Sequence, residues 1–318
     1  MRYCIGVDLG GTNIAIGLID LDSKRILNKK SVKTRAPRPC REISEDVKEL
    51  CFALCRDEKI DITEVEWIGI ATPGIVKSGV VVSAVNLGWT NERFGDIVSE
   101  LTGRPTYTAN DANAAAYAEA VWGCGIGAES LIAVTLGTGV GGGIILNGKI
   151  WEGFNGIAAE LGHMVIAANG RHCACGLRGC LEAYCSATAL VHETRRMMKL
   201  YPDSIMWEIV QGDITRADGR TAFEANKRGD MAAHQIIDDF VSYLAIGIAN
   251  VINVFQPSVV CVGGGISGQG EELMKPLRDR LRYTSFGTKD SRTRVEAAVY
   301  KNDAGIIGAG LLGLMEEN

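Results

Sequence analysis

The segment RHCACGLRGCLE, residues 171–182, holds three cysteines close together: Cys173, Cys175 and Cys180. Three thiolates with one histidine nitrogen are a common ligand set of tetrahedral structural zinc. Ten cysteines in a chain whose start shows no secretory leader indicate free thiols in a reducing compartment. The spacing Cys-x-Cys also differs from the Cys-x-x-Cys of a redox dithiol. The segment therefore predicts a metal site and not a disulfide.

The fourth ligand of such a site has three candidates. His172 adjoins Cys173, and neighbouring side chains diverge too far to bind one ion easily. Cys185 lies on a helix that begins near Glu182, so it points away if Glu182 faces a binding site. His163 lies ten residues before Cys173, which leaves enough chain to fold back toward the cysteines. The spacing therefore favours His163.

Three glycine-rich turns could surround a nucleotide's phosphates with main-chain N–H groups. They are DLGGT at 8–12, GTGVGG at 137–142 and GGGISG at 263–268. The last two contain the letters GxGxxG, but neither has the strand–turn–helix context and the later acidic residue of a dinucleotide site. No Gly-Lys-Ser/Thr follows any turn, which excludes a P-loop. Asp8 supplies a carboxylate where magnesium and its waters could bind between phosphates.

Composition limits the classes of partner. The 318 residues carry a net charge of −5 with 22% charged residues, which argues against a general nucleic-acid or membrane-surface binder. Residues 240–270 hold no charged residue, but asparagines, a proline and glycines interrupt them too often for a membrane span. We expect a buried helix and then a buried strand there.

The apolar pattern predicts alternating strands and helices. Strands are expected at 3–9, 14–20, 26–32, 66–74, 106–109, on both sides of the turn at 137–142, at 258–264 and at 293–299. Helices are expected at 41–58, 93–102, 182–199, 204–211, 221–228, 231–255 and 270–282, and two more begin at 111 and 303. A Gly/Val-rich loop is expected between 74 and 93. The unit of strand, glycine turn with threonine, and strand occurs twice, which predicts two similar lobes with a cleft between them.

Several motifs together resemble the ROK family of repressors, open reading frames and sugar kinases. They are DLGGT (8–12), NDAN (110–113), LGTGVGGG (136–143), ELGH (160–163) and CACGLRGCLE (173–182), in order over nearly the whole chain. The continuation LEAYCSATAL most resembles the bacterial glucokinases of that family. The resemblance implies an α/β, actin-like (ribonuclease H-like) two-lobed sugar kinase fold with ATP in the cleft. We place a small lobe at 1–118 with 303–318, and a large lobe with the zinc site at 119–302.

The resemblance also implies the reaction, which is ATP-dependent phosphorylation of the 6-hydroxyl of a hexose, with glucose giving glucose 6-phosphate. Asp111 matches the family's catalytic aspartate and would accept the hydroxyl proton. The sugar-binding residues expected are Asn86, Asn110, Asp111, Glu160, His163 and Glu182, with backbone near Gly74. The ATP-binding residues expected are Asp8, Gly10, Gly11, Thr12, Gly137, Thr138, Gly139, Gly263, Gly264 and Gly265. The zinc ligands expected are His163, Cys173, Cys175 and Cys180.

The expected partners are a hexose and ATP with Mg²⁺, and structural Zn²⁺ would hold the loop that carries the sugar ligands. The resemblance further implies a homodimer. The free cysteines indicate the cytoplasm, and charge and composition argue against a nucleic-acid or membrane partner. Kinases of N-acetylmannosamine, allose or mannose are the alternative reading, because the sequence does not fix the space around the sugar's C2 and C3. A sugar-responsive repressor is disfavoured, because the family's repressors carry a winged-helix domain before DLGGT and only seven residues precede Asp8 here.

Overall fold

The structure is a computed structural model that describes residues 1–284 and 293–317. The chain forms two compact units. Unit 1 comprises Met1–Leu131, Gly143–Ala159 and Val299–Asn318, and unit 2 comprises Ile132–Gly142 and Glu160–Ala298. The lobe boundaries expected from the sequence stay a prediction, and the two units are described one after the other.

Unit 1 contains a five-stranded sheet with the strand order β3-β2-β1-β4-β8. The strands are β1 (Tyr3–Leu9), β2 (Asn13–Asp20), β3 (Arg25–Lys33), β4 (Val65–Thr72) and β8 (Thr106–Asn110). Strands β1, β2 and β3 pair antiparallel, whereas β1, β4 and β8 run parallel. The carboxyl ends of the three parallel strands therefore meet at one edge of the sheet, where β1 places Asp8 opposite Ala71 of β4.

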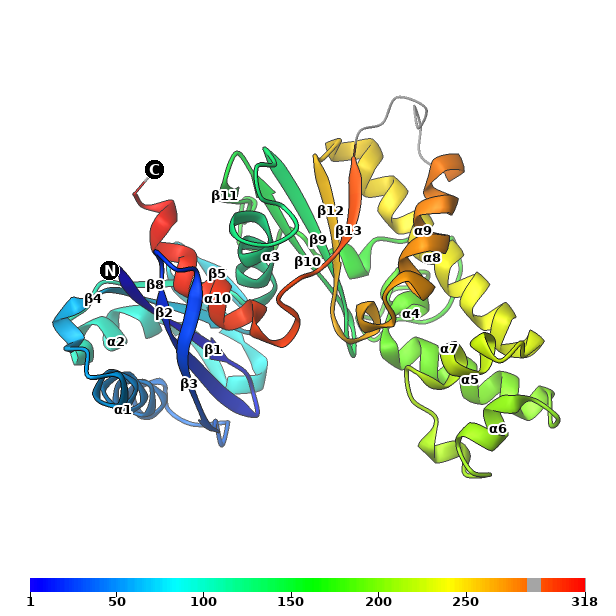
Figure 1. Cartoon of the computed structure of the whole chain (residues 1–318), viewed down its shortest axis with the longest axis horizontal. Coiled ribbons are helices and arrows are strands. Elements are labelled where there is room, and N and C mark those ends of the chain that lie inside the picture. Colours follow the sequence, from blue (N-terminus) through cyan, green and yellow to red (C-terminus); the bar gives the residue numbers. More distant parts are fainter. Residues whose placement is uncertain (285–292, 318) are drawn as a thin grey trace. The chain divides into compact units, whose positions relative to one another are not determined.

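The helices of unit 1 cover the two faces of this sheet differently (Figure 1). The apolar side chains of β1 and β2 form one core with helix α1 (Cys40–Glu58) and helix α2 (Phe94–Thr102). The opposite face packs against helix α10 (Ala304–Leu311), which also contacts helix α3 (Asp111–Val121). This alternation follows from the two-residue period of a strand, which places Ile5 and Val7 on one face and Gly6 and Asp8 on the other.

Helix α10 approaches the sheet so closely that the strands beneath it need glycine. A Cβ atom placed on Gly6 would lie 1.9 Å from the carbonyl oxygen of Ile306, and one on Gly69 would lie 1.7 Å from that of Ala309. The indole Nε1 of Trp67 donates a hydrogen bond of 2.7 Å to the carbonyl of Gly310. The backbone of the helix thus rests directly on the backbone of β1 and β4.

The prediction of a loop between 74 and 93 was wrong. The structure has a three-stranded antiparallel sheet there, with β5 (Ile75–Lys77), β6 (Val80–Ala84) and β7 (Trp89–Glu92). Ser78 and Gly79 connect β5 to β6, and both have positive φ angles, 49° and 77°. Two such residues form the tight hairpin turn that matches the twist of its strands, but Ser-Gly signals it less clearly than Asn-Gly.

A second five-stranded sheet has the order β11-β10-β9-β12-β13. Its strands are β9 (Ser130–Leu136), β10 (Val140–Leu146), β11 (Lys149–Ile150), β12 (Val259–Gly263) and β13 (Arg294–Ala297). The helices of unit 2 are α4 (Glu182–Cys185), α5 (Ala187–Leu200), α6 (Ile205–Ile209), α7 (Thr221–Lys227), α8 (Met231–Phe255) and α9 (Glu271–Thr284). The helix expected at 182–199 is two helices, because the Ser186 side chain accepts the N–H of Ala189 at 3.0 Å and caps α5.

Short 3₁₀ helices complete the fold. They span Ile62–Glu64, Val85–Leu87, Leu161–His163, Ile214–Arg216, Gly265–Gln269, Lys301–Asp303 and Leu312–Met315. Three of them carry expected site residues, since Asn86 lies in the second, His163 ends the third and Gly265 begins the fifth.

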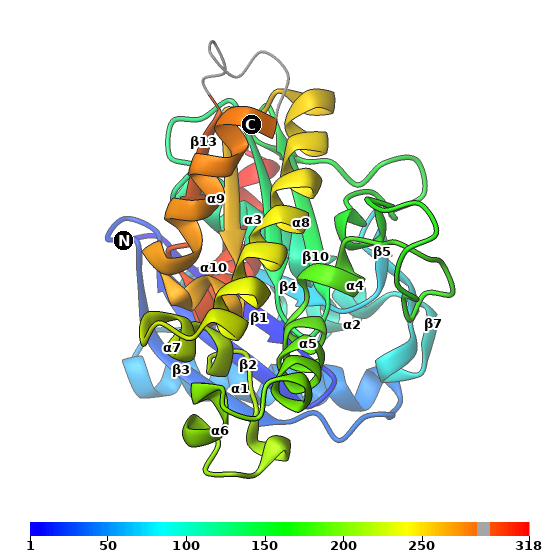
Figure 2. The ribbon, with the colours of Figure 1, turned by 90° about the vertical axis from the view of Figure 1, so that its right-hand side faces the viewer.

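Helix α8 is long and apolar enough to cross a membrane by length and composition alone. However, 61% of its apolar window is buried inside the structure, and it contacts helices α5, α7 and α9. Figure 2 shows α8 and α9 side by side. The helix is therefore accounted for as the core helix of unit 2, as the sequence predicted.

The close packing of α10 predicts the effect of a single methyl group. Gly69→Ala should lower the free energy of unfolding by about 3 kcal/mol, because the new atom meets main chain that side-chain rotation cannot move. Gly219→Ala is the control, since nothing lies within 4 Å of a Cβ atom there. Urea unfolding of both variants measures the difference. Equal midpoints would contradict the described contact.

Candidate active site

Two aspartates lie at the carboxyl edge of the parallel strands in unit 1. Asp8 is the penultimate residue of β1, and Asp111 is the first residue of α3, directly after β8. Asp8 is partly buried, whereas Asp111 is exposed. Burial and, to a lesser degree, the negative charge of Asp111 raise the pKa of Asp8 from 3.8 to about 6. Two nearby carboxylates of this kind suit a divalent cation, which would offset their repulsion.

Asn110 positions the start of helix α3. Its Oδ1 accepts the N–H groups of Ala112 and Asn113 at 3.0 and 3.2 Å, and its Nδ2 donates to the carbonyl of Gly74 at 2.9 Å. The N–H of Ala112 also donates to Oδ1 of Asp111 at 2.8 Å. The side-chain amide of Asn110 therefore has its oxygen engaged twice and can offer its second N–H to a sugar hydroxyl.

The first glycine turn is fixed by a threonine that sequence reasoning did not select. The N–H of Gly10 donates to the carbonyl of Asn13 at 2.9 Å, which closes the turn. Thr34 is fully buried, and its hydroxyl donates to the carbonyl of Gly10 at 2.6 Å while its N–H donates to that of Thr12 at 2.9 Å. A lone threonine after a lysine-rich strand gives no signal of this role.

Asn86 lies beside the same turn. A Cβ atom on Gly11 would lie 3.5 Å from the Cβ of Asn86, and the Asn86 side chain is exposed. Unit 1 thus brings Asn86 to the turn at 8–12, which Asp8 begins.

The other two glycine turns meet in unit 2. The turn at 137–139 is closed by a hydrogen bond of 3.0 Å from the N–H of Gly137 to the carbonyl of Gly139. Gly264 has φ of +83°, and a Cβ atom there would lie 2.5 Å from the carbonyl oxygen of Leu136. The turns that follow β9 and β12 are therefore in direct contact. Gly263 ends β12, and Gly265 begins the 3₁₀ helix after it.

Helix α5 begins against the turn at 137–139. The N–H of Ala187 donates to the carbonyl of Gly137, and the hydroxyl of Thr188 donates to that of Thr138, both at 2.8 Å. These bonds engage carbonyl groups of the turn, and Thr138 itself is exposed. The turn is therefore held from its carbonyl side, as an anion-binding loop requires.

Glu182 is held by three neighbours in unit 2. Its Oε2 accepts the N–H of Val140 at 2.9 Å, and its Oε1 lies 3.7 Å from the thiol of Cys173. A Cβ atom on Gly139 would lie 2.3 Å from Oε2. The carboxylate therefore links the second glycine turn to the cysteine segment.

The expected zinc ligands come together in unit 2. The donor atoms of His163, Cys173, Cys175 and Cys180 all lie within 4.8 Å of one another. Nδ1 of His163 lies 3.7 Å from Sγ of Cys173, and the Sγ atoms of Cys175 and Cys180 are also 3.7 Å apart. A tetrahedral ion with bonds of ~2.3 Å separates its ligand atoms by about 3.8 Å, so this donor set fits zinc.

The other two candidates for a fourth ligand lie elsewhere. Nε2 of the exposed His172 lies 2.5 Å from the guanidinium of Arg178. The buried thiol of Cys185 donates to the carbonyl of Phe240 at 3.8 Å. The structure thus groups His163, and neither His172 nor Cys185, with the three cysteines.

The second ring nitrogen of His163 faces the sugar ligands that the sequence analysis named. Its Nε2 lies 4.0 Å from Oε2 of Glu160, and the Glu160 side chain is exposed. The ends of the loop between Glu160 and Glu182 are joined by main-chain bonds, including Leu181 N–H to Met164 O at 2.9 Å. Three polar side chains of one loop, Glu160, His163 and Glu182, therefore lie close to the cysteine cluster.

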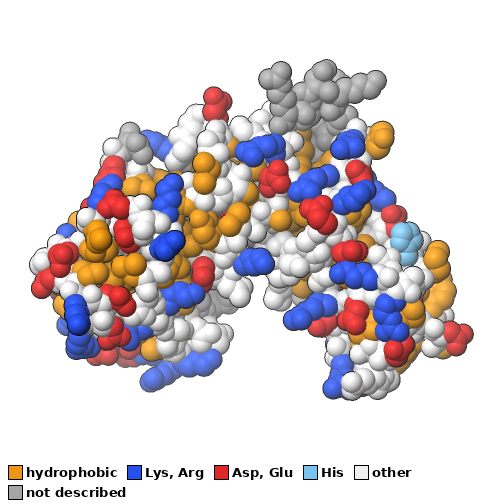
Figure 3. All heavy atoms as spheres, in the orientation of Figure 1, with side chains coloured by type: hydrophobic (Ala, Val, Ile, Leu, Met, Phe, Trp, Pro, Cys, Tyr) orange, Lys and Arg blue, Asp and Glu red, His pale blue; other side chains and the backbone are white. Residues whose placement is uncertain are grey.

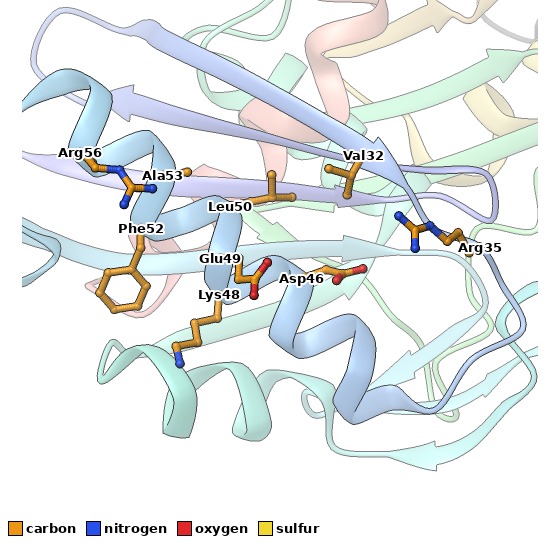
Figure 4. Close-up of a pocket in the computed structure, with 9 residues that line it drawn as sticks. All are labelled: Val32, Arg35, Asp46, Lys48, Glu49, Leu50, Phe52, Ala53 and Arg56. Atoms are coloured by element: carbon orange, nitrogen blue, oxygen red, sulfur yellow. The ribbon is translucent and has the colours of Figure 1, made fainter.

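Each unit has a cavity among its described residues, and only the cavity in unit 2 is lined by expected site residues. One of about 930 Å³ in unit 2 is lined by Thr138, Gly139, Cys173 and Glu182 and by one face of α5. Another of about 590 Å³ in unit 1 is lined by α1 and the end of β3 and contains none of the expected site residues (Figure 4). On the face drawn in Figure 3, basic and acidic side chains are interspersed.

Comparison with known proteins gives a consistent result. The model of the ROK family matches residues 4–316. A glucokinase of Thermotoga maritima is 38% identical over 308 residues, which cover 96% of this chain and 95% of that protein. A ROK family glucokinase from Streptomyces griseus, solved in complex with glucose and AMPPNP, is 35% identical with a TM-score of 0.79 and 98% coverage of both chains. A ROK hexokinase from Thermus thermophilus is 32% identical with a TM-score of 0.78 and 99% coverage of both.

The raised pKa of Asp8 predicts a cost in stability. Between about pH 4 and 6 the unfolded chain loses this proton before the folded chain does, so the folded wild type loses stability as pH rises through that window. Asp8→Asn does not titrate and should be more stable than the wild type by up to about 3 kcal/mol at pH 8. At pH 3.5 the difference should vanish. Urea unfolding in magnesium-free buffer measures it, and a difference independent of pH would contradict the assignment.

Proposed function

Because the chain belongs to the ROK family and is an ATP-dependent sugar kinase, we propose that Asp111 is the base that receives the proton of the glucose 6-hydroxyl. The reaction is phosphoryl transfer from ATP to glucose, which gives glucose 6-phosphate. The observation that carries the assignment of residues is the pair Asp8 and Asp111 at one edge of the sheet, where burial and, to a lesser degree, the charge of Asp111 raise the pKa of Asp8. Similarity to glucokinases over nearly the full length supports the same reading.

The surroundings of Asp111 suit a base that acts late in the transfer. Phosphoryl transfer passes through a loose transition state, so the hydroxyl proton leaves late and a positioned carboxylate suffices to accept it. The N–H of Ala112 fixes one Asp111 oxygen, and Asn110 fixes the turn that presents it. The exposure of Asp111 keeps it accessible to a substrate.

The glycine turns are proposed to bind the triphosphate through main-chain N–H groups. Such amides bind phosphate oxygens without a lysine, and the carbonyls of the turns at 8–12 and 137–139 are already engaged by Thr34, Ala187 and Thr188. Mg²⁺ bound with ATP would neutralise the developing phosphate charge. Asp8 would hold the waters of that ion, and the repulsion between its carboxylate and Asp111 supports this role.

Sugar recognition is assigned to the loop around the cysteine cluster, together with Asn86 and Asn110. Each sugar hydroxyl donates and accepts, so carboxylates and an imidazole nitrogen are suitable partners. Zinc bound to the four donors would hold both ends of this loop and fix the tautomer of His163. His163 would then present Nε2, on the side of Glu160, to a hydroxyl group.

The proposal extends to the setting of the reaction. All ten cysteines are free, which supports a reducing compartment such as the cytoplasm. We also propose that the protein forms a homodimer and that its preferred hexose is glucose. N-acetylmannosamine is the alternative substrate, because the same ligands would serve a hexose with a larger C2 substituent.

Asp111→Asn should lower kcat for glucose by at least about 100-fold, because the amide cannot accept the hydroxyl proton. The dissociation constant of glucose should change by less than about threefold, since the amide keeps the size of the carboxylate and one oxygen that can accept the N–H of Ala112. A coupled ADP assay and calorimetric titration measure the two quantities. Retained turnover would remove Asp111 from this role.

The wild type assayed with glucose, mannose, allose and N-acetylmannosamine tests the substrate. We expect the highest kcat/KM for glucose. A higher value for N-acetylmannosamine would replace glucose in the proposal without affecting Asp111.

Removal of the metal should weaken glucose binding and stability together. Cys175→Ser should purify without zinc, melt at a lower temperature and bind glucose at least about tenfold more weakly, because the sugar ligands share one loop with the cluster. Cys185→Ala is the control, since this thiol lies outside the cluster and should leave the zinc content unchanged. Elemental analysis, thermal melting and glucose titration give three separate readouts. Unchanged glucose affinity in zinc-free protein would contradict the role of the metal.

A further inference from the structure

Two carboxylates of the proposed site pack against the bare Cα atom of a glycine. Glu182 lies against Gly139, which belongs to the second glycine turn. Asp8 lies against Gly305, which no motif includes. A Cβ atom on Gly305 would lie 2.5 Å from Oδ2, 2.6 Å from Cγ and 3.1 Å from Oδ1 of Asp8. The three nearest atoms thus all belong to one carboxylate.

Gly305 differs in this respect from the other glycines of the same contact. A Cβ atom on Gly308 would meet the main chain of Ala114 at 1.8 Å, and atoms on Gly6 and Gly69 would meet the main chain of α10. Those glycines permit the helix to pack. Gly305 instead leaves room for a side chain that the proposed reaction uses.

Neither backbone can move away from the other. Asp8 is paired with Ala15 of β2 and with Ala71 of β4, so its main chain is held on both sides. On the opposite side, the buried carboxylate of Glu119 accepts the N–H groups of Val299 and Tyr300, both at 2.8 Å, just before α10. A side chain at 305 would therefore displace the Asp8 carboxylate and little else.

We propose that Gly305 is a positioning residue for Asp8, and that its missing side chain holds open the rotamer in which Asp8 serves the magnesium–ATP complex. The inference rests on the proposed function of Asp8. Helix α10 lies beside β1 in Figure 1, and its first turn brings Gly305 to the end of that strand. The C-terminal segment of the chain thereby takes part in the site at the N-terminus.

The test is Gly305→Ala, assayed for kcat, for the magnesium–ATP KM, for glucose affinity and for thermal stability. Alanine is favoured over glycine in a helix by up to about 1 kcal/mol, so the variant should fold and melt near the wild-type temperature. We expect kcat to fall at least tenfold and the Mg²⁺ concentration for half-maximal rate to rise, with glucose affinity unchanged. A folding defect alone would instead lower activity, glucose affinity and thermal stability together.

Gly310→Ala is the matched control on the same helix. Its Cβ atom would meet the end of the Ile19 side chain at 2.4 Å and no carboxylate. It should lower the melting temperature through overpacking and keep kcat and the Mg²⁺ dependence. Gly305→Ala should therefore keep stability and lose activity, whereas Gly310→Ala should lose stability and keep activity.

Asp8→Asn separates failure of this inference from failure of the proposed function. If Asp8→Asn loses activity and Gly305→Ala keeps it within twofold, the positioning role is wrong and the function of Asp8 stands. If Asp8→Asn keeps full activity, the role of Asp8 fails and this inference fails with it. If Gly305→Ala loses activity, glucose affinity and stability in parallel, Gly305 is a packing residue only and the inference is overturned.

Discussion

The contact between helix α10 and the glycine face of strands β1 and β4 is the constraint on which unit 1 depends. Main chain lies on main chain there, because Gly6 and Gly69 have no side chain to separate the two layers. The contact joins residues from opposite ends of the sequence, and the indole of Trp67 bonds to Gly310 within it. A layer this thin leaves little solvent between the helix and the end of β1.

The chemistry of unit 1 follows from this packing. Asp8 is on the face of β1 that α10 covers, so its carboxylate is partly buried beside Gly305 and near the charge of Asp111. Burial makes the ionised form costly, and a cation would restore the balance. In the proposed site, stability and activity would therefore be opposed at this residue, because the magnesium–ATP complex needs a charge that folding alone would leave neutral.

In unit 2 the proposed sugar ligands lie on an irregular loop and not at the end of a sheet strand. The segment from Glu160 to Glu182 has almost no regular structure, yet the sugar binding proposed for it requires its polar side chains to stay in place. Four donor atoms within 4.8 Å and a Glu182 carboxylate bonded to Val140 hold it. The proposed metal ion would replace the hydrophobic core that so short a loop cannot form.

The sequence by itself determined the local features: most strands and helices, the glycine turns, the cysteine segment and the family motifs. These depend on periodicity and on residue types close along the chain, which sequence displays directly. Only the tertiary structure decided the rest. The hairpin at Ser78 and Gly79, the break at Ser186 and the support by Thr34 depend on turn angles and distant hydrogen bonds. Gly305 lies almost 300 residues from Asp8, and sequence carries no sign of a contact between the ends of a chain, because packing alone brings them together.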